Sequence, residues 1–312
     1  MAVDIYTTYE SKGNREDITD EISNIAPKDV IFMNSIGTGK AKAVKHDFQT
    51  DTLRAASLAN AQLQKAVPSY RVITPTVKLT NDVQFLDDWY QIADAMDQID
   101  KAGRKSEADY QAPLFAAGLA KDIELSLLEQ VGPVSDTTDL AAKMRGAENW
   151  CVTNIDKGAN DTINGTTGVV TIVDGARSIT EAMIGDTCQN IYSQGGEVHT
   201  ALCGSYQKRA VSEVLQGASQ RRFMIEKSKV DASVDVYASD FGTISFKIHR
   251  GMATSVIFFY DPKLWKKCWL QTVKKEILSR AGTFTNYQLS CSLTLEAKNE
   301  KGNGRIVNLA TS

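Results

Sequence analysis

Residues 106–131 read SEADYQAPLFAAGLAKDIELSLLEQV, and this stretch decides the fold class. Its apolar residues recur at spacings of three and four, which places them along one stripe of a helix. These residues are Ala112, Phe115, Ala116, Leu119, Ala120, Ile123 and Leu127. Ser106 is the expected N-cap, and Gly132 with Pro133 ends the pattern. The spacing predicts a helix of about 25 residues, roughly 40 Å long, that forms the spine of a domain.

Pro113 lies inside this predicted helix. A proline there lacks the N–H of one helical hydrogen bond, and its ring clashes with the carbonyl of Asp109. The cost is about 3 kcal/mol unless the helix bends. We therefore predict a bend near Asp109.

The chain before the helix is expected to be extended. Residues 1–45 show no sustained helical or strand periodicity and are predicted to form an N-terminal arm that either stays loose or lies across another surface, for example that of a neighbouring subunit. In residues 46–93, extended pieces such as HDFQTDTL and VQFLDDWYQI flank an Ala-rich polar middle. Two long strands joined by a tip fit this pattern. Pro68, Pro75 and the charges suit an exposed loop that a partner orders.

The chain after the helix mixes helices and strands. In a region that begins near Arg145, Ser178 and Glu181 form a capping box that starts a helix, and Gly195-Gly196 ends it. The strand VHTALC and a helix from Ser205 to about Leu215 follow. This mixture predicts a compact second domain in an α+β fold.

Residues 230–312 are predicted to be mostly strand. SVDVYAS and TISFKIH flank a turn at Asp240–Gly242, and VIFFY and YQLSCSLTLEA follow. Asp261-Pro262 is expected to open a short helix that carries Trp265 and Trp269, and Asn303-Gly304 is a hairpin signal. Strands this late are expected to pair back with residues 94–140, around the spine helix.

Composition indicates a folded protein. Of the 312 residues, 42% are hydrophobic and 23% are charged, close to the globular average. The net charge of -3 argues against sequence-independent binding of nucleic acid, which needs a basic surface. The five cysteines are odd in number and far apart, so they are expected to be buried thiols in a reducing compartment. No apolar run is long enough to span a bilayer, and the N-terminus is not signal-like, so we expect a soluble protein.

Patterns typical of catalytic or metal sites are incomplete in this sequence. Gly37-Thr-Gly39-Lys40 resembles part of a P-loop, but Asn34 and Ala41 stand where that motif needs Gly and Ser or Thr. The histidines His46, His199 and His249 lack zinc-site spacing. Asp94, Asp97 and Asp100 are better explained as a solvated helix face than as a cation site. We predict no catalytic residue, cofactor or metal, although a triad assembled from distant residues would be invisible in the sequence.

The residues at both ends of the chain resemble a known family. GNREDITDEISNIAPKDVIFM, residues 13–33, followed by HDFQTDTL, is similar to the N-terminal signature of tailed-bacteriophage major head proteins with the Hong Kong 97 fold. NDVQFLDDWYQI, DKAGRKSEADYQ and AKDIELSLL resemble the segment from that family's extended loop into its spine helix. VDVYASDFGTISFKIHR and LTLEAKNEKGNGRIVNLATS resemble its C-terminal region, whereas residues 132–175 correspond poorly.

The resemblance implies a division of the chain into four parts. It implies an arm over residues 1–45, an extended loop over 46–93, a peripheral domain over 94–140 and 230–312, and an axial domain over 141–229. Deleting residues 1–40 is then expected to leave a folded core that does not form shells. Four residues are candidates for contacts between subunits, with Trp89 favoured because a large ring in an exposed loop needs a partner. The four are Asp51, Arg71, Trp89 and Arg104.

The implied function is a virion shell protein that is not an enzyme. It would self-assemble into hexamers and pentamers around double-stranded DNA, inside the host bacterial cytoplasm. Its implied partners are further copies of itself, a portal protein, a decoration or cement protein, and a separate scaffolding protein, because the chain lacks a long N-terminal helical extension. No lysine and asparagine pair can be assigned to a covalent cross-link. An encapsulin-like compartment shell and, from another class, a two-domain α+β enzyme remain the alternatives.

Overall fold

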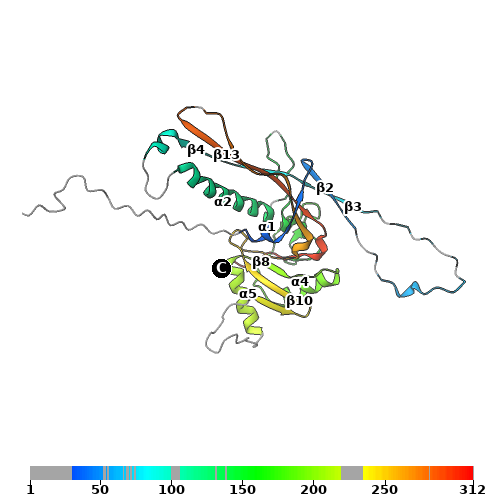
Figure 1. Cartoon of the computed structure of the whole chain (residues 1–312). Helices are drawn as coiled ribbons and strands as arrows, with labels where there is room; N and C mark the ends of the chain where they lie inside the picture. The colour runs from blue at the N-terminus through cyan, green and yellow to red at the C-terminus, as the bar shows by residue number, and fades with distance from the viewer. Residues whose placement is uncertain are drawn as a thin grey trace, which may run out of the picture.

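Two β-sheets and the helices that cover them form the body of this computed structural model, and an extended loop projects to one side (Figure 1). The structure describes residues 30–51, 54, 56–65, 67, 70, 72–73, 75–99, 106–130, 132–137, 139–218, 235–280 and 282–311. Helices and strands alternate irregularly along the chain, and most strand pairs are antiparallel. The architecture is the predicted α+β class.

The spine helix forms where the sequence predicts it. This helix, α2, spans Glu107–Leu128, and the Ser106 hydroxyl caps it by accepting a hydrogen bond from Asp109 N at 3.3 Å. The sequence predicted that the helix ends near Val131. It ends at Leu128 instead, because the backbone of Glu129, with a ψ of 135°, is no longer helical. The buried side chains confirm the apolar stripe; they include Leu119, Ile123 and Leu127.

Pro113 lies within α2, which continues through it without interruption. Pro113 is exposed and lies in the second turn of the helix. At that place only the bond to the carbonyl of Asp109 is lost, and solvent can hydrate that carbonyl. The helix therefore tolerates the proline without ending.

A four-stranded sheet packs one face against α2 (Figure 1). Its order is β1-β12-β13-β4, with β1 parallel to β12 and the other pairs antiparallel. The strands are β1 Gly37–Lys40, β12 Trp265–Ile277, β13 Phe284–Ala297 and β4 Gln84–Ala93. Tyr90 of β4 stacks between Phe115 of α2 and Tyr287 of β13, at centroid distances of 4.5 Å and 4.9 Å. The late strands thus pair back around the spine helix, as predicted.

Two sequence predictions for this sheet are wrong. Residues 84–93 were expected in the extended loop, but as β4 they pair with β13, because burying Tyr90 and Ile92 against α2 favours the sheet. Trp265 and Trp269 were expected on a short helix. That helix is one 3-10 turn, Pro262–Leu264, capped by Asp261, and both tryptophans lie on strand β12.

The extended loop leaves the body through a two-stranded hairpin. Strands β2 Lys45–Thr50 and β3 Val77–Asp82 pair antiparallel, and the chain between them forms the projection in Figure 1. A single 3-10 turn, η1 Leu58–Asn60, lies within it. The hairpin predicted from the sequence is therefore confirmed for its first strand and for the strand that contains Lys78 and Leu79.

The second sheet has six strands and is covered by two helices. Its order is β5-β14-β11-β8-β10-β9. The strands are β5 Ile155–Asp156, β14 Gly304–Ile306, β11 Ile257–Tyr260, β8 Thr200–Cys203, β10 Gly242–Ile248 and β9 Val236–Ser239. The helices are α4 Glu181–Ser193 and α5 Ser205–Ala218. The hairpin β9–β10 and the strand β8 confirm the sequence predictions for these segments.

Three predictions in this second sheet need correction. Residues 236–260 and 304–306 were assigned with the spine helix, but they pair here, because their apolar side chains complete the core under α4 and α5. Asn303-Gly304 does not turn a hairpin, since β14 pairs with β11 and β5. Helix α4 is capped by Thr180, whose hydroxyl accepts from Met183 N at 3.4 Å, and not by Ser178.

Strand β11 joins the two halves of the body. Phe258 and Tyr260 face the core that contains α2, whereas Ile257 and Phe259 face the core under α4 and α5. All four side chains are completely buried. The six-stranded sheet is therefore covered on both faces, by helices on one and by the rest of the body on the other.

The remaining elements are short. They are α1 Ile31–Ser35, η2 Asp94–Gln98, α3 Ala147–Trp150, β6 Thr162–Ile163, β7 Val170–Thr171 and η4 Glu300–Gly302. All five cysteines are free and buried, as predicted. Among the described residues, no helix is both long and apolar enough to cross a membrane.

The arm predicted over residues 1–45 is part of the body from Val30 onward. Phe32 in α1 is fully buried, and β1 is hydrogen-bonded to β12. This structure argues against the expectation that deleting residues 1–40 leaves a folded core, because that deletion removes a core side chain and a strand. Residues 1–29 lie outside the described part of the chain.

Candidate assembly interface

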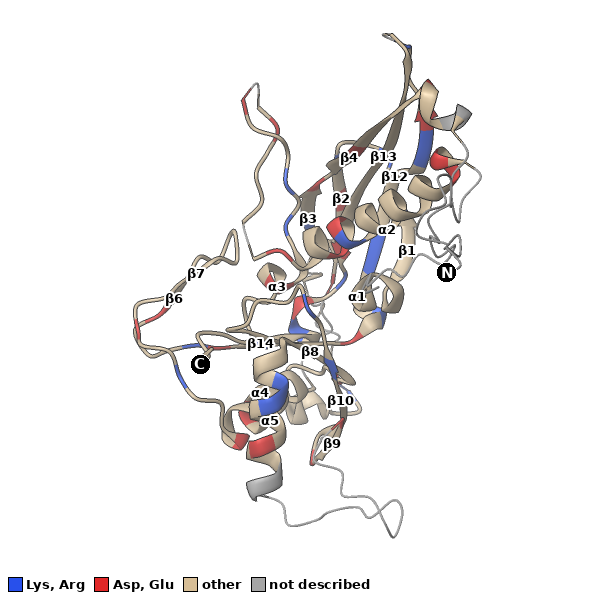
Figure 2. Ribbon diagram, turned by 90° about the vertical axis from the view of Figure 1, so that its left-hand side faces the viewer, with Lys and Arg blue, Asp and Glu red and all other residues tan. Residues whose placement is uncertain are grey.

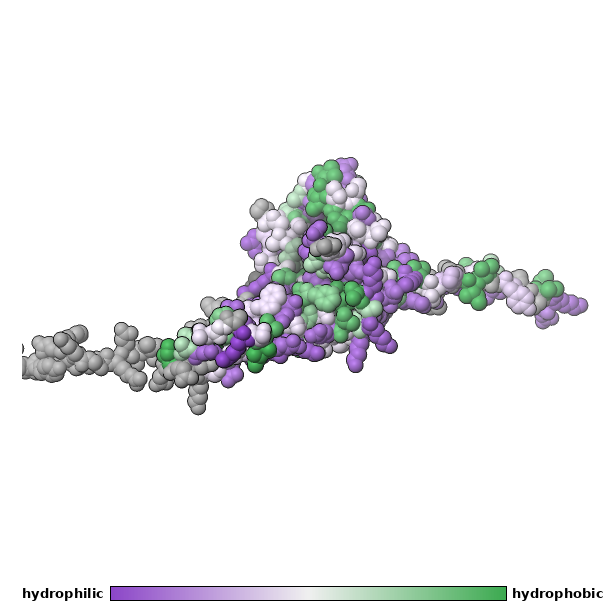
Figure 3. All heavy atoms as spheres, turned by 90° about the horizontal axis from the view of Figure 1, so that it is seen from above, coloured by the Kyte–Doolittle hydropathy of each residue, from purple (hydrophilic) through white to green (hydrophobic). Residues whose placement is uncertain are grey.

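The loop between β2 and β3 carries apolar side chains that the chain itself does not cover. Six of them each expose at least 84% of their surface: Leu58, Leu63, Val67, Tyr70, Val72 and Ile73. Figure 3 shows hydrophobic patches along this projection, separated by polar ones. Burial of a side chain of this size stabilises by roughly 1.5–3 kcal/mol, so the loop is a strong candidate for contact with another molecule.

The root of this loop, in contrast, is fixed to the body. Phe48 of β2 is buried and its ring lies 5.6 Å from that of Trp150. At the end of β3, Asn81 Nδ2 donates to the Leu295 carbonyl at 2.8 Å, and Asn81 Oδ1 accepts from Arg145 N at 2.8 Å. An ordered root sets the direction in which the loop projects.

Charged side chains add cross-strand order to the same hairpin. Asp47 accepts a hydrogen bond from Thr80 at 2.6 Å and pairs with Lys78 at 2.6 Å. The bonds from Lys78 and Thr80 hold the pKa of Asp47 below its usual value. These residues are exposed, so the pair contributes little stability and mainly fixes which residues face each other.

Edge strand β4 presents a second apolar surface. Its side chains alternate, with Tyr90 and Ile92 buried toward α2 and Phe85 and Trp89 pointing the other way. Phe85 is 54% and Trp89 61% exposed, and β4 is the edge strand of its sheet among the described residues. An exposed apolar edge strand is a surface on which another chain can pack.

The four contact candidates from the sequence fall in different places. Trp89 lies on the outer face of β4, as above, and Asp51 follows β2 at the start of the loop, where it is exposed. Arg71 and Arg104 lie outside the described residues. Sequence reasoning missed Phe85, which the alternation with Trp89 would have identified once the packed face of β4 was known.

Charge is distributed over the body without a dominant basic face. In the ribbon of Figure 2, the positions of Lys and Arg residues are interspersed with those of Asp and Glu residues in both halves of the body. This agrees with the net charge of -3.

The described residues include a small depression between α4 and the β9–β10 hairpin. It holds about 210 Å³ of free space, open solvent included, and its lining includes Cys188, Tyr192 and Phe241. Ligand sites commonly exceed roughly 300 Å³. Burial raises the pKa of Cys188 to about 11, so this thiol is not a reactive nucleophile at neutral pH.

Comparison with known proteins decides between the classes left open by the sequence. Residues 5–310 match a family described as the SU10 major capsid protein. The chain belongs to this family. The match covers almost the whole chain, so it includes both halves of the body and the loop between β2 and β3.

Relatives of known role agree with the family. The major capsid protein of Escherichia phage Phieco32 is 22% identical to this chain over an alignment 341 positions long. The alignment covers 96% of each chain. Among solved structures, the capsid of cyanophage A-1(L) has a TM-score of 0.66 at 11% identity, covering 98% of this chain and 99% of that one. The capsid of a native GTA particle has a TM-score of 0.63 at 12% identity, covering 97% of both chains.

These findings confirm the main predictions from the sequence. The fold is the Hong Kong 97-like capsid fold, and the chain is a phage major capsid protein that self-associates into the shell of the virion. The encapsulin-like shell and the two-domain enzyme are set aside. The family is one of structural proteins.

Proposed function

We propose that this chain builds an icosahedral or prolate head from hexamers and pentamers, and that the loop between β2 and β3 ties each subunit to its neighbours. The observation that carries the proposal is the combination of a fixed root with a tip whose apolar side chains are uncovered. An isolated chain gains nothing from exposing these side chains, whereas a neighbouring subunit can bury them.

Closed shells built from one chain need contacts that repeat from subunit to subunit and tolerate several angles. A loop that extends away from its own body meets this need, because it can follow a neighbour while the body keeps its shape. Each contact can be modest, since a subunit held by several neighbours is retained by multivalency. The outer face of β4, with Trp89 and Phe85, is a second contact in this proposal.

The parts of the chain take the roles implied by the family. The segment before Val30 acts as the arm, α2 with the four-stranded sheet forms the peripheral domain, and the six-stranded sheet with α4 and α5 forms the axial domain. The head assembles in the host bacterial cytoplasm with a portal protein, a separate scaffolding protein and a decoration or cement protein. Double-stranded DNA is enclosed without tight binding, in line with the net charge of -3. The chain has no catalytic role in this proposal.

Two loop variants test the proposal. In the double variant Leu63→Asp/Ile73→Asp, two exposed apolar side chains become charged, so the subunit should fold normally but no longer form shells. Gln62→Asp is the matched control, because it adds a charge at an equally exposed position next to Leu63 without removing an apolar contact. Electron microscopy and analytical ultracentrifugation over a concentration series, with and without a crowding agent, measure shell formation. Wild-type yields of shells from the double variant would contradict the role of the loop.

A further inference from the structure

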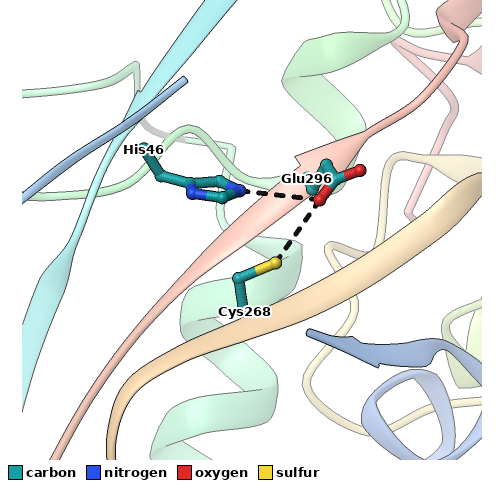
Figure 4. Close-up of side chains that lie close together, drawn as sticks. All are labelled: His46, Cys268 and Glu296. Atoms are coloured by element: carbon teal, nitrogen blue, oxygen red, sulfur yellow. Dashed lines mark hydrogen bonds and ion pairs between the residues drawn. The ribbon is translucent and has the colours of Figure 1, made fainter. Parts of the chain in front are cut away.

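Three side chains with metal-ligating atoms meet beside the root of the extended loop (Figure 4). They are His46 on β2, Cys268 on β12 and Glu296 on β13. Glu296 Oε2 lies 3.5 Å from His46 Nε2 and 3.5 Å from Cys268 Sγ. All three ligand atoms lie within 4.8 Å of one another. The chain thus brings an imidazole, a thiol and a carboxylate to one point from three strands.

Two of the three separations among these atoms fit a tetrahedral ion. Zinc binds His N, Asp or Glu O and Cys S at about 2.0–2.3 Å, so two ligand atoms on one tetrahedral zinc lie roughly 3.3–3.8 Å apart. The two 3.5 Å separations lie in this range. Nitrogen, oxygen and sulfur donors together suit zinc or cobalt, and do not suit magnesium or calcium.

The surroundings favour a site over an ordinary packed cluster. His46 Nε2 is buried and, although it pairs with Glu296 Oε2 at 3.5 Å, it makes no hydrogen bond. Buried polar atoms are rarely left in this state, and an ion between His46 and Glu296 would satisfy it. Cys268 is 1% exposed, and the side chains of His46 and Glu296 are 15% and 18% exposed, so the cluster lies just beneath the surface.

Gly39 explains how the thiol fits beside β1. In the parallel pair of β1 and β12, Gly39 lies opposite Cys268. A Cβ at position 39 would lie only 2.7 Å from Cys268 Sγ, so glycine leaves the space that the sulfur occupies. The glycine that resembled part of a P-loop in the sequence thus borders the cluster.

We propose that His46, Cys268 and Glu296 form a binding site for a divalent transition metal of the zinc class. The ion would link the hairpin β2–β3 to β12 and β13, and so would fix the loop root to the four-stranded sheet. Three protein ligands leave one position for water. On binding, the Cys268 thiol loses its proton to the buffer and the thiolate bonds the metal, while Glu296 no longer accepts a hydrogen bond from it.

Metal titration of the purified full-length protein, freed of metal with a chelator, tests the site. Addition of cobalt chloride should give one bound ion per chain and the absorption of a thiolate–cobalt bond, and zinc chloride should displace it. Cys268→Ser and His46→Gln should each remove the thiolate absorption or weaken binding at least about 100-fold. His46→Gln keeps the proposal testable if Cys268→Ser does not fold.

Cys291→Ser is the matched control. Cys291 is a buried thiol like Cys268, but it lies on the neighbouring strand β13 and does not belong to the cluster. It should bind cobalt as the wild type does. The proposal is overturned if the wild type binds no stoichiometric ion, or if folded Cys268→Ser keeps the full absorption and affinity. Neither result bears on shell formation, so the test is independent of the proposed assembly role.

Discussion

Glu124 Oε1 lies 3.2 Å from His249 Nε2, and these two side chains are 0% and 2% exposed. The same carboxylate accepts hydrogen bonds from Phe32 N at 2.6 Å and Met33 N at 2.7 Å. Glu124 belongs to α2, His249 follows β10 of the second sheet, and Phe32 and Met33 open α1. One buried carboxylate of the spine helix therefore joins three parts of the chain.

Glu124→Gln should destabilise the subunit by about 3 kcal/mol, because the amide cannot replace a carboxylate that accepts from two N–H groups and faces a histidine. Urea unfolding followed by circular dichroism measures the change. Glu129→Gln is the matched control, because Glu129 directly follows α2, five residues after Glu124. Lys143, the partner of Glu129 at 3.0 Å, is about half exposed, so that variant should lose less than about 1 kcal/mol. Equal losses would contradict the joining role of Glu124.

Truncation of the N-terminus should have two distinct outcomes. Deletion of residues 1–29 leaves Phe32, α1 and β1 in place, so the subunit should keep its unfolding midpoint. Deletion of residues 1–40 removes the fully buried Phe32 ring and the strand beside β12, and should cost at least about 3–5 kcal/mol. Thermal unfolding of the two proteins compares them. A stable folded protein lacking residues 1–40 would show that α1 and β1 are dispensable.

Trp89→Ala should leave the stability of the subunit within about 0.5 kcal/mol and reduce shell formation, because the ring is mostly exposed on the outer face of β4. Gln91→Ala is the control, since Gln91 is exposed two residues further along the same strand. Light scattering during assembly, followed by electron microscopy, gives the yield of shells. If Trp89→Ala assembles like Gln91→Ala, the outer face of β4 is not a contact.

The buried carboxyl of Glu148 should make the free energy of unfolding depend on pH. Burial raises the pKa of this carboxyl from 4.5 to about 7, although Gln130 donates a hydrogen bond to it at 2.6 Å. A raised carboxyl pKa means that the folded state keeps a proton which the unfolded state has lost. Stability is therefore lost as the pH rises through the window from 4.5 to about 7, by about 3 kcal/mol in total.

Glu148→Gln should remove this part of the pH dependence, so that the variant is more stable than the wild type at pH values above about 7 and similar below about 4.5. Urea unfolding at a series of pH values measures the difference. Glu129→Gln serves again as the control, because it removes a carboxyl that is partly exposed. Parallel curves for wild type and Glu148→Gln would contradict the raised pKa.

Elements with a strong local signal were predictable from the sequence. The cap at Ser106 and the stripe through Leu119, Ile123 and Leu127 give α2, and the turn at Asp240–Gly242 gives the β9–β10 hairpin. These signals arise within a few residues, where capping and periodicity act. The resemblance to phage head proteins supplied the fold family.

Elements whose state depends on distant partners were mispredicted. A spacing of four between Trp265 and Trp269 suits one face of a helix or one face of a strand. The strand is favoured because Trp265 is buried and its indole donates to Asn303 Oδ1 at 2.9 Å, a contact no short-range pattern contains. In the same way, the grouping of His46 with Cys268 and Glu296 has no signal in sequence spacing, since it exists only after β2, β12 and β13 are brought together.

The alternation along β11 has a mechanical consequence. Because Phe258 and Tyr260 are locked into one core while Ile257 and Phe259 are locked into the other, neither half of the body can shift along this strand without disturbing both. A force applied to one half, such as internal pressure on the shell, is therefore resisted by both halves together. The body carries such a load as one unit, up to the root of the loop, where Phe48 and Asn81 hold β2 and β3 to it.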